Sequence, residues 1–159
     1  MGKVLSTFTN GWPGSISRSV DDVVITRANG GTTDILPGKP VFLDTSTGKV
    51  KAFANGMTFS TFVGFAVRTP SKTPDSYGES VAAYKPNEPV DILVRGTIVV
   101  ETNGTISPGG NVHARTTDGT LVPTPIAEGG SFQLTNCHFR GPADSSNRTE
   151  LVITERNLV

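Results

Sequence analysis

The sequence predicts an all-β protein: a single antiparallel β-barrel or β-sandwich with an extended N-terminal arm. Three observations carry this prediction. The 18 glycines and 11 prolines among 159 residues leave few stretches long enough for a helix, because both residues are unfavourable inside helices. From residue 30 onward, short β-prone runs alternate with turn dipeptides and no helical segment separates them. The length corresponds to one ordinary domain, so we expect one core.

The first 21 residues are predicted to form the arm, and residues 22–159 the barrel or sandwich. Gly and Pro interrupt the first 14 residues so often that regular structure is not expected there. This stretch also contains Trp12, the only tryptophan of the chain. An apolar anchor on an irregular segment indicates contact with a partner, because Trp and Arg are enriched at interface hot spots. The alternative is that Trp12 folds back onto its own barrel.

The first regular element is expected within residues 15–29, which contain neither Gly nor Pro. Two patterns predict different structures here: apolar residues at helical spacing favour a helix, and a β-branched run favours a strand. The β-branched run predicts extended structure over residues 22–27, with one helical turn starting at Ser19 as an addition before it. The apolar residues at helical spacing are Ile16, Val20, Val23 and Val24.

Further strands are predicted between turn dipeptides, of which the Asn-Gly and Asp-Gly pairs suit the positive φ angles of hairpins. The strongest is the run 89–101, in which Gly96 marks a bulge or bend. The dipeptides are Asn29-Gly30, Pro37-Gly38, Thr47-Gly48, Asn55-Gly56, Asn103-Gly104, Pro108-Gly109 and Asp118-Gly119. The strands are expected near residues 40–44, 48–53, 62–68, 80–84, 89–101, 111–116, 120–123, 131–139 and 149–155.

Residues 37–50 align without gaps on residues 108–121, at an offset of 71 positions. Each segment contains a Pro-Gly turn, a strand, a hairpin with a glycine and a return strand. Two interpretations remain open: an internal duplication, or the independent use of common turn dipeptides.

Known catalytic and metal-binding patterns are missing from the sequence. The stretch 31–40 has six residues between its glycines and a proline after Lys39, so it is not a phosphate-binding loop. Cys137 and His138 are neighbours on a predicted strand, so their side chains face opposite ways and cannot act as a nucleophile and base. With His113 as the only other histidine, we expect no metal site, no cofactor and no enzymatic activity.

The charge balance argues against nucleic acid and membrane partners. Fourteen basic residues balance fourteen acidic ones, so the chain lacks the positive field that attracts nucleic acid or anionic lipid. No window approaches the length of a membrane span, and the first ten residues do not resemble a signal peptide. We therefore expect a soluble protein made in a cytoplasm.

Four segments together resemble the structural cement proteins that decorate the capsids of tailed bacteriophages. Their order and spacing match from about residue 11 to residue 156, whereas residues 142–148 fit less well. The segments are Gly14-Ser-Ile-Ser-Arg-Ser-Val-Asp21, Pro37-Gly-Lys-Pro-Val41, Val63-Gly-Phe-Ala-Val-Arg68 and Glu88-Pro-Val-Asp-Ile-Leu-Val-Arg-Gly96.

The resemblance implies a non-enzymatic virion protein, made in the host bacterial cytoplasm, that binds the outer surface of the assembled head. Its implied partners are the major capsid protein and further copies of itself, as a dimer or trimer. Such a protein would clamp neighbouring capsomers against the pressure of packaged DNA. On this view the arm adds a strand to the capsid protein, with Trp12, Ile16 and Val20 filling pockets and Arg18 making a charged contact.

Two other classes remain as alternatives. One is a β-sandwich binding module of a virion or tail that recognises carbohydrate or protein; such modules usually display an aromatic platform. The other is a small β-barrel hydrolase, which would need a cleft that gathers His113, His138 or a pair of carboxylates.

Overall fold

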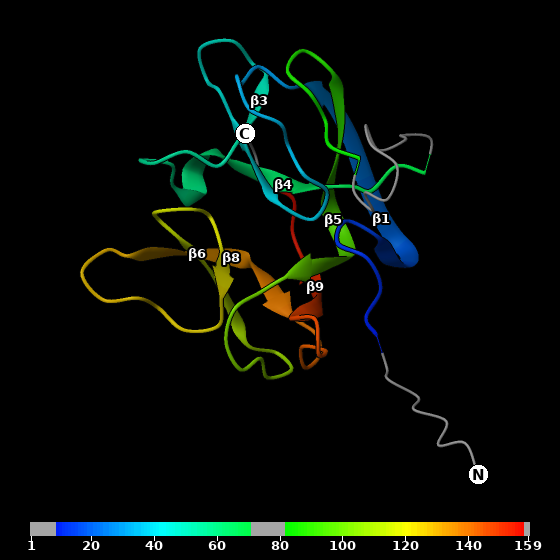
Figure 1. Cartoon of the computed structure of the whole chain (residues 1–159), viewed down its shortest axis with the longest axis vertical. Coiled ribbons are helices and arrows are strands. Elements are labelled where there is room, and N and C mark those ends of the chain that lie inside the picture. The colour runs from blue at the N-terminus through cyan, green and yellow to red at the C-terminus, as the bar shows by residue number, and fades with distance from the viewer. Residues whose placement is uncertain (1–8, 71–81, 158–159) are drawn as a thin grey trace.

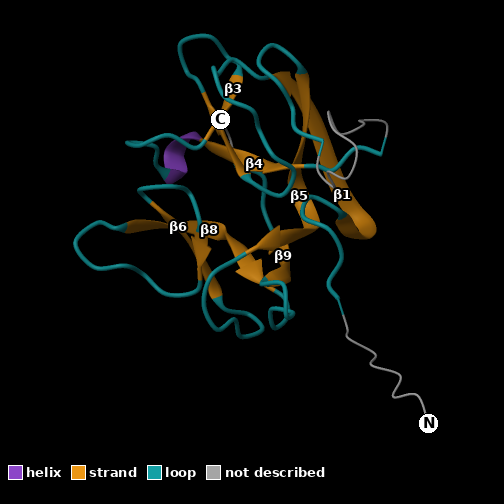
Figure 2. Ribbon diagram, in the orientation of Figure 1, coloured by secondary structure: helices purple, strands orange, loops and turns teal. Residues whose placement is uncertain are grey.

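The computed structural model describes residues 9–70 and 82–157 and confirms the all-β prediction (Figures 1 and 2). Its sheet is antiparallel and curls into a half-barrel. Within the described residues the only helical element is one 3-10 turn, η1 (Phe59–Thr61). The strands are β1 (Ile16–Ala28), β2 (Pro40–Leu43), β3 (Val50–Ala52), β4 (Phe62–Ala66), β5 (Pro89–Glu101), β6 (Asn111–Arg115), β7 (Leu121–Val122), β8 (Ser131–Phe139) and β9 (Arg148–Ile153).

Strand β5 connects the two halves of the sheet, as Figure 1 shows. The strand order is β3-β2-β4-β5-β9-β8-β6-β7, and β1 also pairs with β5. Strand β4 pairs with β5 around Leu93, whereas β9 pairs with it from Gly96 to Glu101. Because β5 is covered on both faces, its apolar residues do not simply alternate with polar ones: Ile92 and Val94 belong to one buried cluster, and Leu93 belongs to another.

The larger buried cluster lies between the two halves and is rich in phenylalanine. The ring of Phe42 meets those of Phe53, Phe62 and Phe132 edge to face, with centroids 5.6, 5.9 and 6.2 Å apart. Edge-to-face contacts are favourable because the positive edge of one ring meets the negative face of the other. Phenylalanines from β2, β4 and β8 thus join strands that are distant in sequence.

Most predicted strands are confirmed to within about two residues, but the strand predicted at 80–84 is not. Residues 80 and 81 lie outside the described residues, and Tyr84 forms only an isolated bridge with Ile35. Tyr84 is buried, and its hydroxyl donates a hydrogen bond to the carbonyl of Val67 (2.6 Å). Tyr84 is therefore buried as a core aromatic residue whose hydroxyl is hydrogen-bonded, and it does not need a strand to hold it there.

The extended arm is not supported in the described residues, and no helical turn forms at Ser19. Strand β1 begins at Ile16, so it runs across the expected boundary between residues 21 and 22. Before it, the Gly14 N–H donates to the Val99 carbonyl (2.8 Å), and the Val99 N–H donates to Ser15 (2.9 Å). The segment is thus held on β5 from Gly14 onward, because these backbone groups find partners there.

The similarity between residues 37–50 and 108–121 is also structural. Leu43 pairs with Val50 in the β2–β3 hairpin, and Ala114 pairs with Leu121, 71 positions later, in the β6–β7 hairpin. In the first hairpin the Gly48 N–H donates to the Asp44 carbonyl (2.8 Å). Gly119 and Arg115 form the equivalent bond in the second (2.9 Å).

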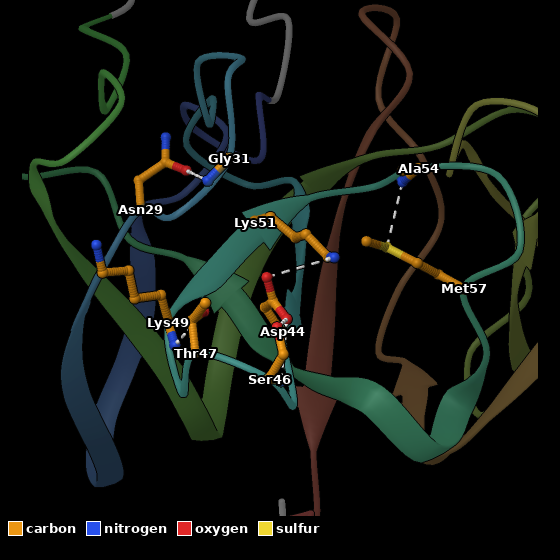
Figure 3. A network of polar contacts seen from close by, with 9 residues as sticks. All are labelled: Asn29, Gly31, Asp44, Ser46, Thr47, Lys49, Lys51, Ala54 and Met57. Atoms are coloured by element: carbon orange, nitrogen blue, oxygen red, sulfur yellow. Dashed lines mark hydrogen bonds and ion pairs between the residues drawn. The ribbon is translucent and has the colours of Figure 1, made fainter.

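Side chains around the two turns differ although the backbone is shared. In the β2–β3 turn, the Asp44 carboxylate accepts hydrogen bonds from the Ser46 backbone N–H and hydroxyl and lies 3.8 Å from the Lys51 ammonium (Figure 3). The Ser46 hydrogen bonds are the main reason that the pKa of Asp44 is lowered. In the β6–β7 turn, Asp118 instead accepts from the Thr120 N–H (2.9 Å).

The repeat extends beyond the hairpins to two five-stranded units that share β5. The first has the order β3-β2-β4-β5-β1 and the second the order β7-β6-β8-β9-β5. Their registers agree: Ala28 pairs with Pro89 where the first unit closes, and Glu101 pairs with Arg148 at the equivalent place in the second. Strand β1 of the first unit therefore corresponds to β5 of the second, at an offset of 73 residues.

Candidate functional site

The candidate site is the surface formed by the segment from Trp12 to Val20, which we call the Trp12–Val20 surface. Its first anchor is Asn10, whose side-chain amide donates to the Arg148 carbonyl (2.6 Å) and whose backbone N–H donates to the Asp144 carboxylate (2.9 Å). Burial alone would raise the pKa of Asp144. The hydrogen bonds that its carboxylate accepts from the backbone N–H groups of Asn10, Arg148 and Ser146 outweigh this effect, so the pKa is lowered. The segment is therefore fixed before it reaches Trp12.

Trp12 remains 47% exposed and is contacted by two arginines. The Arg148 guanidinium lies 4.7 Å from the centre of the indole ring, and that of Arg68 lies 5.3 Å away. Both distances are within the range of cation–π attraction. Arg148 also donates to the Gly11 carbonyl (3.3 Å). The tryptophan is thus held in place while about half of its surface faces solvent, as an interface anchor requires.

The other three predicted contact residues lie in β1 but differ in exposure. Ile16 is half-buried and packs against the larger core cluster, so much of its side chain serves the fold. Arg18 reaches Glu150 of β9 (3.3 Å), and its side chain is 58% exposed. Val20 is 98% exposed, the highest value for a large apolar side chain in the described residues.

Val20 is exposed because β1 bulges away from β5. Arg18 pairs with Thr97 and Val23 pairs with Arg95, so four residues of β1 face the single residue Gly96. Gly96 has a φ of 123°, which favours glycine, and a Cβ there would lie 2.4 Å from the Asp22 carboxylate. The bend expected at Gly96 is therefore confirmed, and the extra residues lie in β1.

The bulge also brings charged side chains together. Asp21 forms an ion pair with Arg95 at 2.7 Å. Asp22 points inward, and its Oδ1 atom is buried with no hydrogen-bond partner among the described residues. Burial raises the pKa of Asp22, the Asp21 charge adds to the shift, and the Thr97 N–H partly offsets it.

Replacement of Asp22 by Asn is expected to stabilise the protein at pH 7. A carboxyl whose pKa is raised by folding binds its proton more tightly in the folded state, so its charge lowers stability at neutral pH and the cost disappears as pH falls. The unfolding midpoint in urea should therefore rise for Asp22→Asn at pH 7, and the gain should shrink towards pH 4. Asp21→Asn is the control: it breaks the exposed pair with Arg95 and removes only the smaller, like-charge contribution to the Asp22 shift, so it should raise stability less than Asp22→Asn. An Asp22→Asn protein less stable than wild type at pH 7 would contradict this assignment.

A groove of about 420 Å³ lies beside the bulge. Arg18 and Arg140 line it together with Val20 and Val152. Along β9, residues at every second position share one face of the strand. Arg148 contacts Trp12, Glu150 contacts Arg18, and Val152 lines the groove with Val20. The segment 12–20 thus contacts the exposed face of β9 at three successive alternate positions.

Five of the eight arginines of the chain lie on or beside the Trp12–Val20 surface. Sequence reasoning found only one of them, because the other four are spread over more than 80 residues and no local motif joins them. Only the pairing of β1 and β9 with β5 brings them together. The five are Arg18, Arg68, Arg95, Arg140 and Arg148.

The residues considered for chemistry are placed elsewhere, on β6 and β8. Cys137 is buried, as expected for a free cysteine, and burial raises the pKa of its thiol far above the ordinary value. His113 is also buried, which lowers its pKa. The described residues contain no group of three His, Cys, Asp or Glu side chains able to hold a metal ion. In the same part of the chain, no helix is long and apolar enough to cross a membrane.

The chain was compared with known families, curated proteins and solved structures. The family model described as structural cement protein (E217 gp24/Pam3 gp6) matches residues 3–154. A solved structure described as the capsid of Myoviridae phage XM1 superposes with a TM-score of 0.75 at 15% identity, covering 96% of both chains. The head fiber gp8.5 N base of bacteriophage phi29 gives a TM-score of 0.43 at 13% identity, covering 87% of this chain and 99% of that one. No curated protein matches.

The family match covers nearly the whole chain, and the similarity to the XM1 capsid structure independently supports the fold. The resemblance found in the four sequence segments is thereby confirmed. The family consists of phage structural proteins, which implies a virion location and an association with capsid proteins. We conclude that the chain belongs to the phage structural cement protein family.

Proposed function

We propose that this protein is a non-enzymatic decoration protein that binds the outer surface of the assembled head and clamps neighbouring capsomers against the pressure of packaged DNA. The observation that carries the proposal is the family match over residues 3–154. Its partners are the major capsid protein and further copies of itself, and it is made in the host cytoplasm before it joins the head.

The clamp acts through binding free energy. A protein that binds the closed shell better than the opened shell stabilises the closed one, because its binding energy must be lost before the capsomers separate. Copies on one lattice act together, so that modest contacts per copy add up to a large effect on the particle. This mechanism needs a firm docking surface and no catalytic group.

We assign the capsid contact to the Trp12–Val20 surface. Trp12 and Arg18 are held in place by neighbouring side chains yet remain about half exposed, and Val20 projects from the bulge. Rigid, partly exposed aromatic and arginine side chains lose little conformational entropy on binding. Ile16 supports this surface from beneath, because it packs on the core.

Sedimentation with undecorated heads tests the proposal directly. Purified protein should pellet with the heads and saturate at a fixed number of copies per particle, and decorated heads should resist heating better than bare ones. Absence of binding at low and moderate salt would overturn the proposal. Retention on a polysaccharide column without head binding would favour the alternative, a carbohydrate-binding module.

Replacement of Val20 by Asp is expected to weaken head binding at least tenfold. A carboxylate that loses its water or meets a like charge at an interface costs roughly several kcal/mol of binding free energy. The fold should be unaffected, because substitutions at exposed positions usually change stability little. Sedimentation at several protein concentrations measures the affinity.

The matched control is Ile126→Asp. Ile126 is also apolar and 39% exposed, but it belongs to the connection between β7 and β8. This variant should bind heads like wild type. If Val20→Asp and Ile126→Asp bind equally well, the capsid contact lies elsewhere on the molecule.

A further inference from the structure

One edge of β1 has no strand beside it in the described part of the chain. β1 pairs with β5 along its other edge, and no other strand among residues 9–70 and 82–157 pairs with it. The strand also exposes two valines, because Val23 is 38% exposed and Val24 is 42% exposed. Long edge strands that expose apolar residues are uncommon on isolated proteins, since their free N–H and C=O groups attract another strand.

The internal repeat identifies this edge as a place built for a strand. β1 in the first unit corresponds to β5 in the second, so Val24 and Thr26 correspond to Thr97 and Val99. In the second unit that edge is occupied: Arg18 pairs with Thr97, and the Val99 backbone exchanges hydrogen bonds with Gly14 and Ser15. By equivalence, the Thr26 N–H and C=O groups face the open edge of β1.

We infer that this edge binds the same edge of a second copy, in antiparallel pairing centred on Val24. The charges on the strand favour that occupant: Asp21 lies three residues before Val24 and Arg27 three residues after it. The Asp21 side chain is 65% exposed, although it also contacts Arg95. In antiparallel pairing the acidic end of each strand meets the basic end of the other, and the valines meet in the middle. Such a contact is self-complementary, as a two-fold dimer requires. The inference rests on the proposed self-association and names its surface; it does not depend on the head.

A cysteine at the centre of the contact provides the first test. Val24→Cys places two thiols opposite each other, at a Cα distance of about 5.5 Å for directly paired residues, which suits a disulfide. The native Cys137 is buried and will not compete. Mild oxidation of the full chain should therefore give a covalent dimer on a denaturing gel. Ser145→Cys, at an exposed position between β8 and β9, is the control and should cross-link far less.

The second test uses repulsion. Val24→Asp places two carboxylates together at the two-fold axis, so the dimer dissociation constant should rise about 100-fold or more. Analytical ultracentrifugation without heads should show a wild-type dimer and a Val24→Asp monomer with unchanged circular dichroism. A monomeric wild-type protein, or Val24→Cys that cross-links no better than Ser145→Cys, would overturn the inference even if heads are bound. If the wild type is monomeric and Val24→Asp no longer sediments with heads, the edge binds capsid protein instead.

Discussion

Deletion of residues 1–21 is expected to lower the free energy of unfolding by about 3 kcal/mol or more, since several hydrogen bonds worth about 1 kcal/mol each and the Ile16 contacts with the core disappear together. The bonds include those of Gly14 and Ser15 with Val99, and the one that Arg68 donates to Gly14. An arm that only reached towards a partner would leave stability unchanged. The two possibilities therefore differ by a measurable amount in urea unfolding.

A chain that lacks only residues 1–8 serves as the control, because every contact named above involves residues from 10 onward. The longer deletion should unfold at a clearly lower urea concentration than this control. If both variants unfold together, residues 10–21 contribute nothing to the fold, and the extended arm would return as the better description. The comparison also shows whether loss of head binding in the longer deletion reflects a lost contact or a lost fold.

Replacement of Gly64 by Ala is expected to have the largest effect of any Gly→Ala change among the described residues. A Cβ at Gly64 would lie 2.1 Å from the Leu93 carbonyl oxygen and 3.0 Å from a methyl carbon of Ile92. Both neighbours belong to β5. The closer one is a backbone atom and cannot rotate away, and Ile92 is fully buried, so its side chain has little room to move. β4 would have to separate from β5, with a cost of at least about 3 kcal/mol, at the upper end for overpacked cores.

Gly109→Ala is the matched control for this prediction. Gly109 has a φ of 76°, but no atom lies within 4 Å of its Cβ position. Alanine there costs only the strain of a left-handed backbone, about 1 kcal/mol. Thermal unfolding should show a much larger loss for Gly64→Ala than for Gly109→Ala. Similar losses for both variants would mean that β4 and β5 can accommodate a methyl group between them.

The Trp12–Val20 surface connects these stability effects to function. Its segment is part of the sheet, so a pull on a bound capsid partner would act on β1, β5 and β9 rather than on a loose chain. A clamp benefits from this arrangement, because a flexible tether would extend before it resisted separation. The corrected position of residues 10–21 thus fits the proposed role better than the arm did.

The candidate site was only partly predictable. Trp12 and Arg18 stand out by residue type, and Val20 by its place in an apolar pattern. The pattern was interpreted as helical spacing, whereas Val20 lies in a bulge opposite Gly96. A bulge depends on what faces the strand, so a single sequence gives little sign of it. The arginines contributed by β5 and by the segments around β4, β8 and β9 could not be predicted either, because only strand pairing brings them to this surface.

The sequence by itself determined the all-β class, most strand positions, the two similar hairpins and the family. These features depend on local chemistry: glycine in turns with positive φ, β-branched residues in strands, and short motifs in a fixed order. Only the tertiary structure decided that β1 starts at Ile16, that β5 belongs to both repeated units, and that one edge of β1 is open. Strand pairing joins residues up to about 80 positions apart, and its energy comes from contacts that exist only once the chain has folded.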